Sequence, residues 1–269
     1  APIVSHDWEK EDRPPTIVYQ PFASAYQAVE NIARNEAVSD GSALRSALSF
    51  TFRLPPIIRD LIARIYRLDD IDLDGLPRAG TATVNGSGVE AVWSGQTGLY
   101  LVLHDERSSR QSNRLEVDLI EQILAAAPQL PDRSTALMTP HRAQRSLLKM
   151  RLGAFSTPVD VIDTVERMQG GERPTVVFSA TVSDPAAIAS NVEFILDLNR
   201  SNVAFSRAQD RLIVVCSRSL LDHVPAELEH YESALLWKSL RALCTQELGR
   251  FVVDGHTVRV LTPPIGIST

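Results

Sequence analysis

From residue 98 onward, short unbroken apolar runs alternate with amphipathic runs, and this alternation limits the fold more than any other feature of the sequence. Runs such as LYLVLH (99–104) and RLIVVCS (211–217) are apolar at consecutive positions, so both faces of each strand must be buried. Strands of that kind occur in parallel sheets covered by helices on both sides. The sequence therefore predicts an α/β domain of three layers, α/β/α, with a mostly parallel sheet.

The other predicted elements follow at short intervals. Further strands are predicted at 135–140, 159–165 and 174–182, and helices at 113–127, 141–152, 199–208 and 232–244. Asn113 is expected to cap the first of these helices, with Glu116 three residues on. Asp254-Gly255 predicts the turn of a closing hairpin within 251–262.

The sequence before residue 98 is less regular. A helix is predicted near 23–34, and Pro55-Pro56 is expected to start another, in which apolar residues recur at helical spacing as far as Tyr66. Residues 68–97 carry acids and then Gly, Thr, Ser and Asn, which predicts a linker or a small insertion. We therefore expect one domain over 46–269, preceded by a separate segment over 1–45.

Composition sets the outer bounds on function. A chain of 269 residues with 44% hydrophobic content can bury a sizeable core, and its net charge of −6 argues against binding nucleic acid through bulk charge. A local groove can still be basic on an acidic protein. Of the 27 basic residues 24 are arginine, which fits either phosphate recognition or a GC-rich genome.

Cysteine usage and the N-terminal residues indicate the compartment. Cys216 and Cys244 lie in apolar patterns typical of buried thiols in a reducing environment, and no spacing of Cys and His fits a metal site. The first residues, APIVSHDWEKEDRPP, lack a signal-peptide pattern, and no apolar run reaches membrane length. We therefore expect a cytoplasmic protein of bacterial origin, without membrane contact, with nucleoid association as one option.

Parallel sheets bind ligands at the carboxyl ends of their strands, so residues that follow strands are the first candidates for a site. Thr139-Pro140-His141 follows one predicted strand, where Thr139 would cap the next helix and leave amides free for a phosphate. An ordinary helix cap explains the same pattern. Gly170-Gly171-Glu172 lies beyond another strand, and a plain glycine turn is the alternative there.

Two arginines, Arg53 and Arg207, stand among apolar residues, and each taken alone is typical of a surface charge with a buried stem. The sequence contains neither the phosphate loop G-x-x-x-x-G-K-[ST] nor G-x-G-x-x-G. No apolar run ends in a paired Asp-Glu of the metal-binding kind; LVLHDERSS comes nearest, but no phosphate loop precedes it. By itself, this chain is not expected to hydrolyse a nucleotide.

Taken in order, several segments resemble motifs of the second RecA-like domain of superfamily 1 helicases, in the Upf1-like/Dna2-like group. LNRSNVAFSRAQDRLIVVCS resembles motif VI, and DTVERMQGGE resembles motif V with Glu166 in place of the usual aspartate. FTFRLPP resembles motif IV, with Arg53 and Pro56 matching. ALMTPHRAQRSLL and NRLE resemble two further segments of that domain. The resemblance implies a RecA-like, P-loop NTPase-like fold without its own Walker A loop.

The resemblance also implies how the chain would take part in catalysis. APIV resembles the residues after motif III, so segment 1–45 would follow a first RecA-like domain that holds most of the ATP and Mg²⁺. Arg53 and Arg207 would be arginine fingers that reach the γ-phosphate across the domain boundary. Gln169, Gly170 and Glu172 would line the nucleotide side of the cleft.

For nucleic acid, the resemblance implies that Thr139, Pro140, His141 and Thr164 contact the backbone of single-stranded DNA or RNA, with His141 in place of the family's tyrosine. Arg142 and Arg145 are either phosphate contacts or part of a solvated helix face. Val182 stands where the family continues S-x-V-R with arginine, so that contact is either missing or made by another residue.

Three hypotheses follow. The first is the C-terminal motor domain of an ATP-dependent superfamily 1 helicase acting on DNA, or alternatively on RNA, with the family's 5′ to 3′ polarity. The second is a degenerate helicase-like domain that binds protein or nucleic acid without ATPase activity. The third is an unrelated doubly wound enzyme with a small-molecule site, which the polar turn DERSSRQS after residue 104 disfavours because it contains no glycine.

Overall fold

The computed structural model describes residues 50–52, 54–67, 70–75, 86–94, 98–128, 130–153, 159–168, 171–227 and 229–264. All of them belong to one compact unit, Ser49–Thr269. Segment 1–45 with its predicted helix, Arg53, Gln169 and Gly170 lie outside the described residues.

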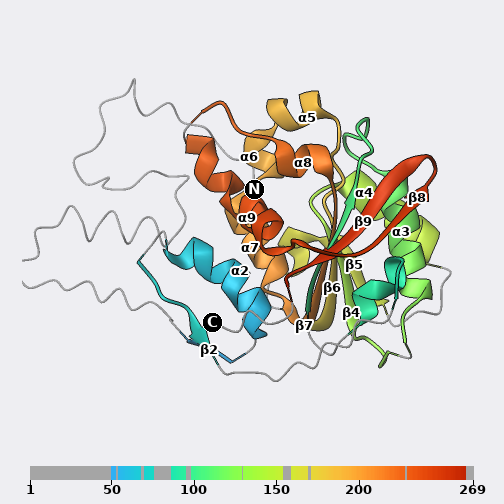
Figure 1. Cartoon of the computed structure of the whole chain (residues 1–269), viewed down its shortest axis with the longest axis horizontal. Coiled ribbons are helices and arrows are strands. Elements are labelled where there is room, and N and C mark those ends of the chain that lie inside the picture. Colours follow the sequence, from blue (N-terminus) through green and yellow to red (C-terminus); the bar gives the residue numbers. More distant parts are fainter. Residues whose placement is uncertain are drawn as a thin grey trace, which may run out of the picture. The chain divides into compact units, whose positions relative to one another are not determined.

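The unit is built on a seven-stranded sheet formed by described residues (Figure 1). The strand order is β5-β4-β6-β7-β3-β9-β8, in which the first five strands are parallel and the last two form an antiparallel hairpin beside β3. The strands are β3 (Gly98–His104), β4 (Thr135–Thr139), β5 (Val159–Thr164), β6 (Arg173–Ser179), β7 (Ala208–Ser217), β8 (Gln246–Val253) and β9 (His256–Thr262).

Helices cover both faces of the sheet because the strands are apolar on both. In β3, Leu99, Leu101 and Leu103 belong to one core cluster, whereas Tyr100 and Val102 belong to the other. The first cluster is covered by α2 (Pro56–Tyr66), α7 (Leu198–Phe205) and α9 (Glu229–Leu243), and the second by α3 (Arg114–Ala125) and α4 (Arg142–Leu152). Figure 1 shows these two groups of helices on opposite sides of the sheet. This three-layer, mostly parallel arrangement confirms the predicted RecA-like fold class.

Several local signals give the structures they predict. Asn113 caps α3, and its side-chain oxygen accepts a hydrogen bond from the amide of Glu116 at 3.1 Å. Helix α2 begins at Pro56, directly after Pro55. Asp254 and Gly255 form the hairpin turn between β8 and β9 with φ of +50° and +80°. Both cysteines are buried free thiols.

Other boundaries differ from the sequence prediction. Thr139 does not cap a helix: it is the last residue of β4, and α4 begins at Arg142 with His141 at the cap position. Strand β6 ends at Ser179, before the predicted 182, because Thr181 takes a left-handed φ of +75° that breaks the extended backbone. Helix α7 ends at Phe205, so Arg207 lies in the turn before β7 and not within the helix.

The remaining described elements are short. Strand β1 (Phe50–Thr51) pairs in parallel with β2 (Asp74–Gly75), and the 3-10 helix η2 (Val89–Trp93) precedes β3. Another 3-10 helix, η3 (Val165–Met168), follows β5. Three short helices, α5 (Pro185–Ser190), α6 (Val192–Ile195) and α8 (Arg218–Asp222), complete the order.

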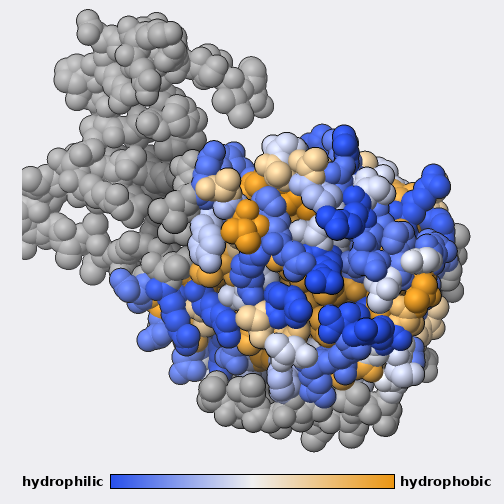
Figure 2. Space-filling view, turned by 45° about the horizontal axis from the view of Figure 1, so that its top comes forward, coloured by the Kyte–Doolittle hydropathy of each residue, from blue (hydrophilic) through white to orange (hydrophobic). Residues whose placement is uncertain are grey.

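On the surface shown in Figure 2, hydrophilic side chains spread over the described residues, and hydrophobic ones form small separate groups between them. In the described part of the chain, we find no helix with the length and apolar character needed to cross a membrane.

Candidate functional site

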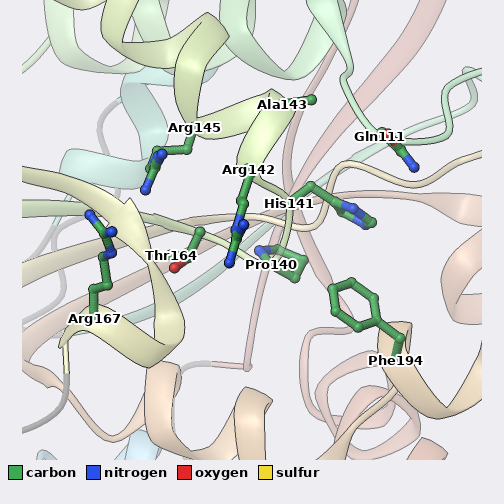
Figure 3. A pocket seen from close by; sticks show the side chains of 9 residues that line it. All are labelled: Gln111, Pro140, His141, Arg142, Ala143, Arg145, Thr164, Arg167 and Phe194. Atoms are coloured by element: carbon green, nitrogen blue, oxygen red, sulfur yellow. The ribbon is translucent and has the colours of Figure 1, made fainter. Parts of the chain in front are cut away.

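The carboxyl ends of β4 and β5 lie side by side, with Thr139 paired to Thr164. Beyond them the surface is hollowed by a cavity of about 560 Å³ (Figure 3). Pro140 and His141 line it from the end of β4, and Thr164 lines it from the end of β5. The other lining residues are Gln111, Arg142, Ala143, Arg145, Arg167 and Phe194. Two loops that are separate in the sequence therefore meet at one hollow.

A second hollow of about 520 Å³ adjoins the first, because Gln111, His141 and Phe194 line both. It extends along α5 and α6, and Arg110 lines it as well. We call the two hollows together the basic groove. Because the two hollows share lining residues, they form one continuous depression.

The charge of the basic groove is positive on balance. Arg145 donates to Asp163 at 3.1 Å, and Arg110 donates to Asp184 at 2.7 Å. Arg167 lies 3.9 Å from the same Asp163 carboxylate. Arg142 is exposed and forms no ion pair with any residue that the structure describes. Four arginines thus line the groove, and only three of them share the two carboxylates, which favours a polyanionic ligand.

Asp163 remains ionised beside these arginines. Burial opposes ionisation, but hydrogen bonds from the Thr164 amide and from Arg145 outweigh it and lower the pKa of Asp163. The carboxylate therefore fixes the position of Arg145 at one end of the cavity.

His141 is a neutral ring within the groove. Burial and the positive charge of Arg200 lower the pKa of His141 to about 4. Its Nε2 atom is buried and has no hydrogen-bond partner among the residues described. Its ring centroid lies 5.2 Å from that of Phe194. His141 therefore presents an uncharged surface between the two hollows.

Thr139, the fourth residue expected to contact nucleic acid, does not line either hollow. It is fully buried, and its hydroxyl lies 3.0 Å from the hydroxyl of Thr181. Val182, at the position of the family's arginine, is also fully buried and packs in the core cluster on the α7 side of the sheet. The structure thus brings Pro140, His141 and Thr164 together at one hollow, whereas Thr139 is buried beneath the surface.

A buried polar network supports the floor of the groove. Glu116, which is fully buried, accepts hydrogen bonds from the hydroxyl of Ser179 and the amide of Thr181. His104 Nε2 lies 3.3 Å from the same carboxylate. Gln144 connects the network to α4 by donating to Ser179 at 2.9 Å. The ends of β3 and β6 and the starts of α3 and α4 are therefore fixed to one another.

A second carboxylate, Glu106, fixes the loop that carries Arg110 and Gln111. Glu106 accepts from the amide and hydroxyl of Ser108 at 2.6 Å each, and from the hydroxyl of Ser183. Although burial alone would raise the pKa of Glu106, these hydrogen bonds lower it to about 2. The loop is thereby anchored to the segment that follows β6.

Of the residues expected near ATP, the two that the structure describes, Glu172 and Arg207, lie at the opposite ends of the strands. Glu172 immediately precedes β6 and Arg207 immediately precedes β7, which are neighbouring parallel strands. The amide of Arg173 donates to the carbonyl of Arg207 at 3.0 Å, and Glu172 accepts from the side chain of Gln209 at 2.7 Å. Arg207 itself is partly exposed. Glu172 and Arg207 therefore lie at the amino ends of the strands that follow them, whereas Pro140, His141 and Thr164 lie at carboxyl ends.

The sequence interpretation missed Gln111, Arg167 and Phe194. Gln111 could have been found, because it lies in the loop after β3 and loops after parallel strands share one edge. Phe194 gave no such signal, since an aromatic residue within VEFI reads as a core residue. Arg142 and Arg145, for which two interpretations stood open, both line the cavity.

No group of three or more His, Cys, Asp and Glu side chains among the described residues is arranged to hold a metal ion. The lining of the basic groove offers arginine, amide, hydroxyl and aromatic groups.

Comparison with known proteins agrees with this architecture. Residues 101–219, from β3 through the first residues of α8, match the model of the AAA domain family. Over 116 residues the chain is 28% identical to the "DNA replication ATP-dependent helicase/nuclease JHS1" of Arabidopsis thaliana. This match covers 42% of the chain and 8% of that relative. The fold, the AAA match and the similarity to this helicase support a superfamily 1 helicase-like domain in this chain.

Proposed function

We propose that this chain is the second RecA-like motor domain of an ATP-dependent superfamily 1 helicase acting on DNA. The observation that carries the proposal is the basic groove, because Pro140, His141 and Thr164 come from two separate loops and line one arginine-rich hollow. A groove of this charge suits the backbone of a single strand.

On the nucleic-acid side, the proposed contacts are of two kinds. Arg142, Arg145 and Arg167 bind phosphate oxygens, and Thr164 donates its hydroxyl to the backbone. His141 is uncharged at neutral pH, so it contributes contact area and a neutral hydrogen bond and not an ion pair. Thr139 supports this surface from below through Thr181.

On the nucleotide side, Arg207 is the proposed arginine finger. It lies at the amino ends of the strands, in the turn between the fully buried Phe205 and the first residue of β7, so its backbone is held in place, and its partly exposed side chain is proposed to reach the nucleotide. A guanidinium there offsets charge that develops on the γ-phosphate during phosphoryl transfer. Glu172, held by Gln209, is proposed to meet the ribose or the γ-phosphate network.

The proposed site also includes Arg53 as a second arginine finger. Further nucleotide contacts are proposed for Gln169 and Gly170. ATP supplies the phosphoryl group, and a first RecA-like domain of the same protein is proposed to hold it together with Mg²⁺. This chain alone is then expected to bind a single strand and to hydrolyse no ATP.

The test is nucleic-acid-stimulated ATPase activity in the parent protein that carries both domains. Arg207→Ala should lower kcat by about 1,000-fold or more, the range typical of an arginine finger, while circular dichroism and the unfolding midpoint stay unchanged. Arg218→Ala is the matched control, because Arg218 is an exposed arginine at the other end of β7. Turnover of Arg207→Ala near that of the control would rule out the role proposed for Arg207.

One observation favours a second candidate, a helicase-like module that binds without ATPase activity. Val182 is buried where the family carries an arginine, so at least one of the family's polar contacts is not made from that position. The same assay separates the two, since a parent protein with no stimulated turnover in its unmodified form fits the binding module.

A further inference from the structure

Phe194 is an aromatic residue exposed at the centre of the basic groove. It lies on α6 and lines both hollows, and 39% of its surface is accessible. Figure 3 shows its ring projecting toward Pro140 and His141, opposite Arg145 and Arg167. The described residues cover the Phe194 side chain only in part, so some of its apolar surface faces the arginine-lined hollows.

The ring is held in place from two directions. The guanidinium of Arg200 lies over the ring, 4.2 Å from its centroid, and also donates to the carbonyl of Phe194 at 2.6 Å. The neutral ring of His141 lies 5.2 Å away at an interplanar angle of 55°. Phe194 is therefore pre-positioned, and little side-chain freedom remains to be lost when a flat ligand stacks on it.

The surroundings define which flat ligand fits. Arg142 is exposed in the same hollow, and Arg145 and Arg167 lie beyond it, so a planar group on Phe194 would be flanked by phosphate-binding side chains. A nucleotide unit of a single strand combines these two chemistries, an aromatic base and an anionic phosphate.

We propose that Phe194 is the stacking platform for one unpaired nucleobase of a single strand whose phosphates are bound by Arg142, Arg145 and Arg167. This inference rests on the proposed nucleic-acid function and adds a base contact to it. Every nucleobase has a flat aromatic face on which stacking depends, so the subsite is expected to bind bases without strong sequence preference.

The test compares two labelled oligonucleotides of equal length, oligo(dT) and the same backbone with abasic sites, by fluorescence anisotropy at low salt with the full 269-residue chain. The unmodified chain should bind oligo(dT) more tightly than the abasic probe. Phe194→Leu should weaken binding to oligo(dT) by between about 5-fold and about 150-fold, and should leave binding to the abasic probe unchanged. Phe194→Tyr should retain most of the affinity, because it keeps the ring.

Each result bears on the proposal. If Phe194→Leu weakens binding to both probes equally, Phe194 is structural and the stacking proposal is wrong, while the groove remains a backbone site. If the unmodified chain binds neither probe, both the nucleic-acid function and the stacking proposal are overturned. If Phe194→Leu fails to fold, Phe194→Trp replaces it: oligo(dT) should then change the new tryptophan's fluorescence and the abasic probe should not, and equal responses would refute stacking.

Discussion

The two carboxylate oxygens of Glu116 accept hydrogen bonds from the backbone amide of Thr181, Oε1 at 3.0 Å and Oε2 at 2.9 Å, although the two residues are 65 positions apart in the sequence. Thr181 needs this support, because a β-branched residue at a φ of +75° is strained. The contact fixes the chain where it leaves β6 and determines that Thr181 faces Thr139 while Val182 turns into the core.

Replacing Glu116 with glutamine should destabilise the domain. The amide group would place a donor where the carboxylate accepts from Ser179 and Thr181, which leaves at least one buried polar group without its partner. We expect the free energy of unfolding in urea to fall by about 2 kcal/mol. The control is Asp132→Asn, an exposed carboxylate whose change should stay within about 0.5 kcal/mol. Equal stability of the two variants would contradict a structural role for the Glu116 network.

Glu106 should make the domain sensitive to acid. Its pKa in the folded protein is about 2, below the ordinary value of 4.5, so the folded state favours the ionised carboxylate. The stabilisation from Glu106 is complete above about pH 4.5 and is lost as the pH falls toward 2. Ser183→Ala removes one hydrogen bond to this carboxylate, so it should raise the pKa of Glu106 in an NMR titration and raise the pH of acid unfolding.

The matched control for Ser183 is Ser190→Ala, because the Ser190 hydroxyl is exposed and bonds to the carbonyl of Ala187. That variant should leave the Glu106 titration unchanged. A Glu106 carboxyl that titrates near 4.5 in the unmodified chain would show that the Ser108 and Ser183 hydrogen bonds do not act as described.

Arg142→Gln should weaken binding of any single strand to a similar degree, because a contact with phosphate does not depend on the base sequence. The plot of log affinity against log salt concentration should become shallower by about 0.7, the value for one phosphate contact on a single strand. Arg250→Gln, on the exposed face of β8, is the control and should leave the slope unchanged. An unaltered slope for Arg142→Gln would place that residue on a solvated helix face.

Much of the fold followed from the sequence because the strands are apolar throughout and the helices keep a clear period. Asn113 and the Asp254-Gly255 turn act through local backbone chemistry, so their roles were also predictable. The meeting of Pro140 and His141 with Thr164 followed from the common edge of parallel strands.

What could not be predicted depends on contacts between distant residues. The Thr139 side chain is buried, and its hydroxyl is hydrogen-bonded to the hydroxyl of Thr181 on another segment. The Phe194 ring contacts Arg200 and His141, which lie on other elements, so no local pattern encodes its position. Arg207 falls beyond the end of α7, and helix ends are the least certain part of a periodic pattern.

Thr164 and Glu172 are eight residues apart, yet one lines the groove and the other precedes β6 at the opposite edge of the sheet. The seven residues of β6 span about 20 Å between those edges, and an eight-residue connection reaches at most about 28 Å when fully extended. Part of this connection is η3, which packs against α7. The two ends of the sheet are thus joined by a short connection, which limits how far Glu172 and Thr164 can move apart.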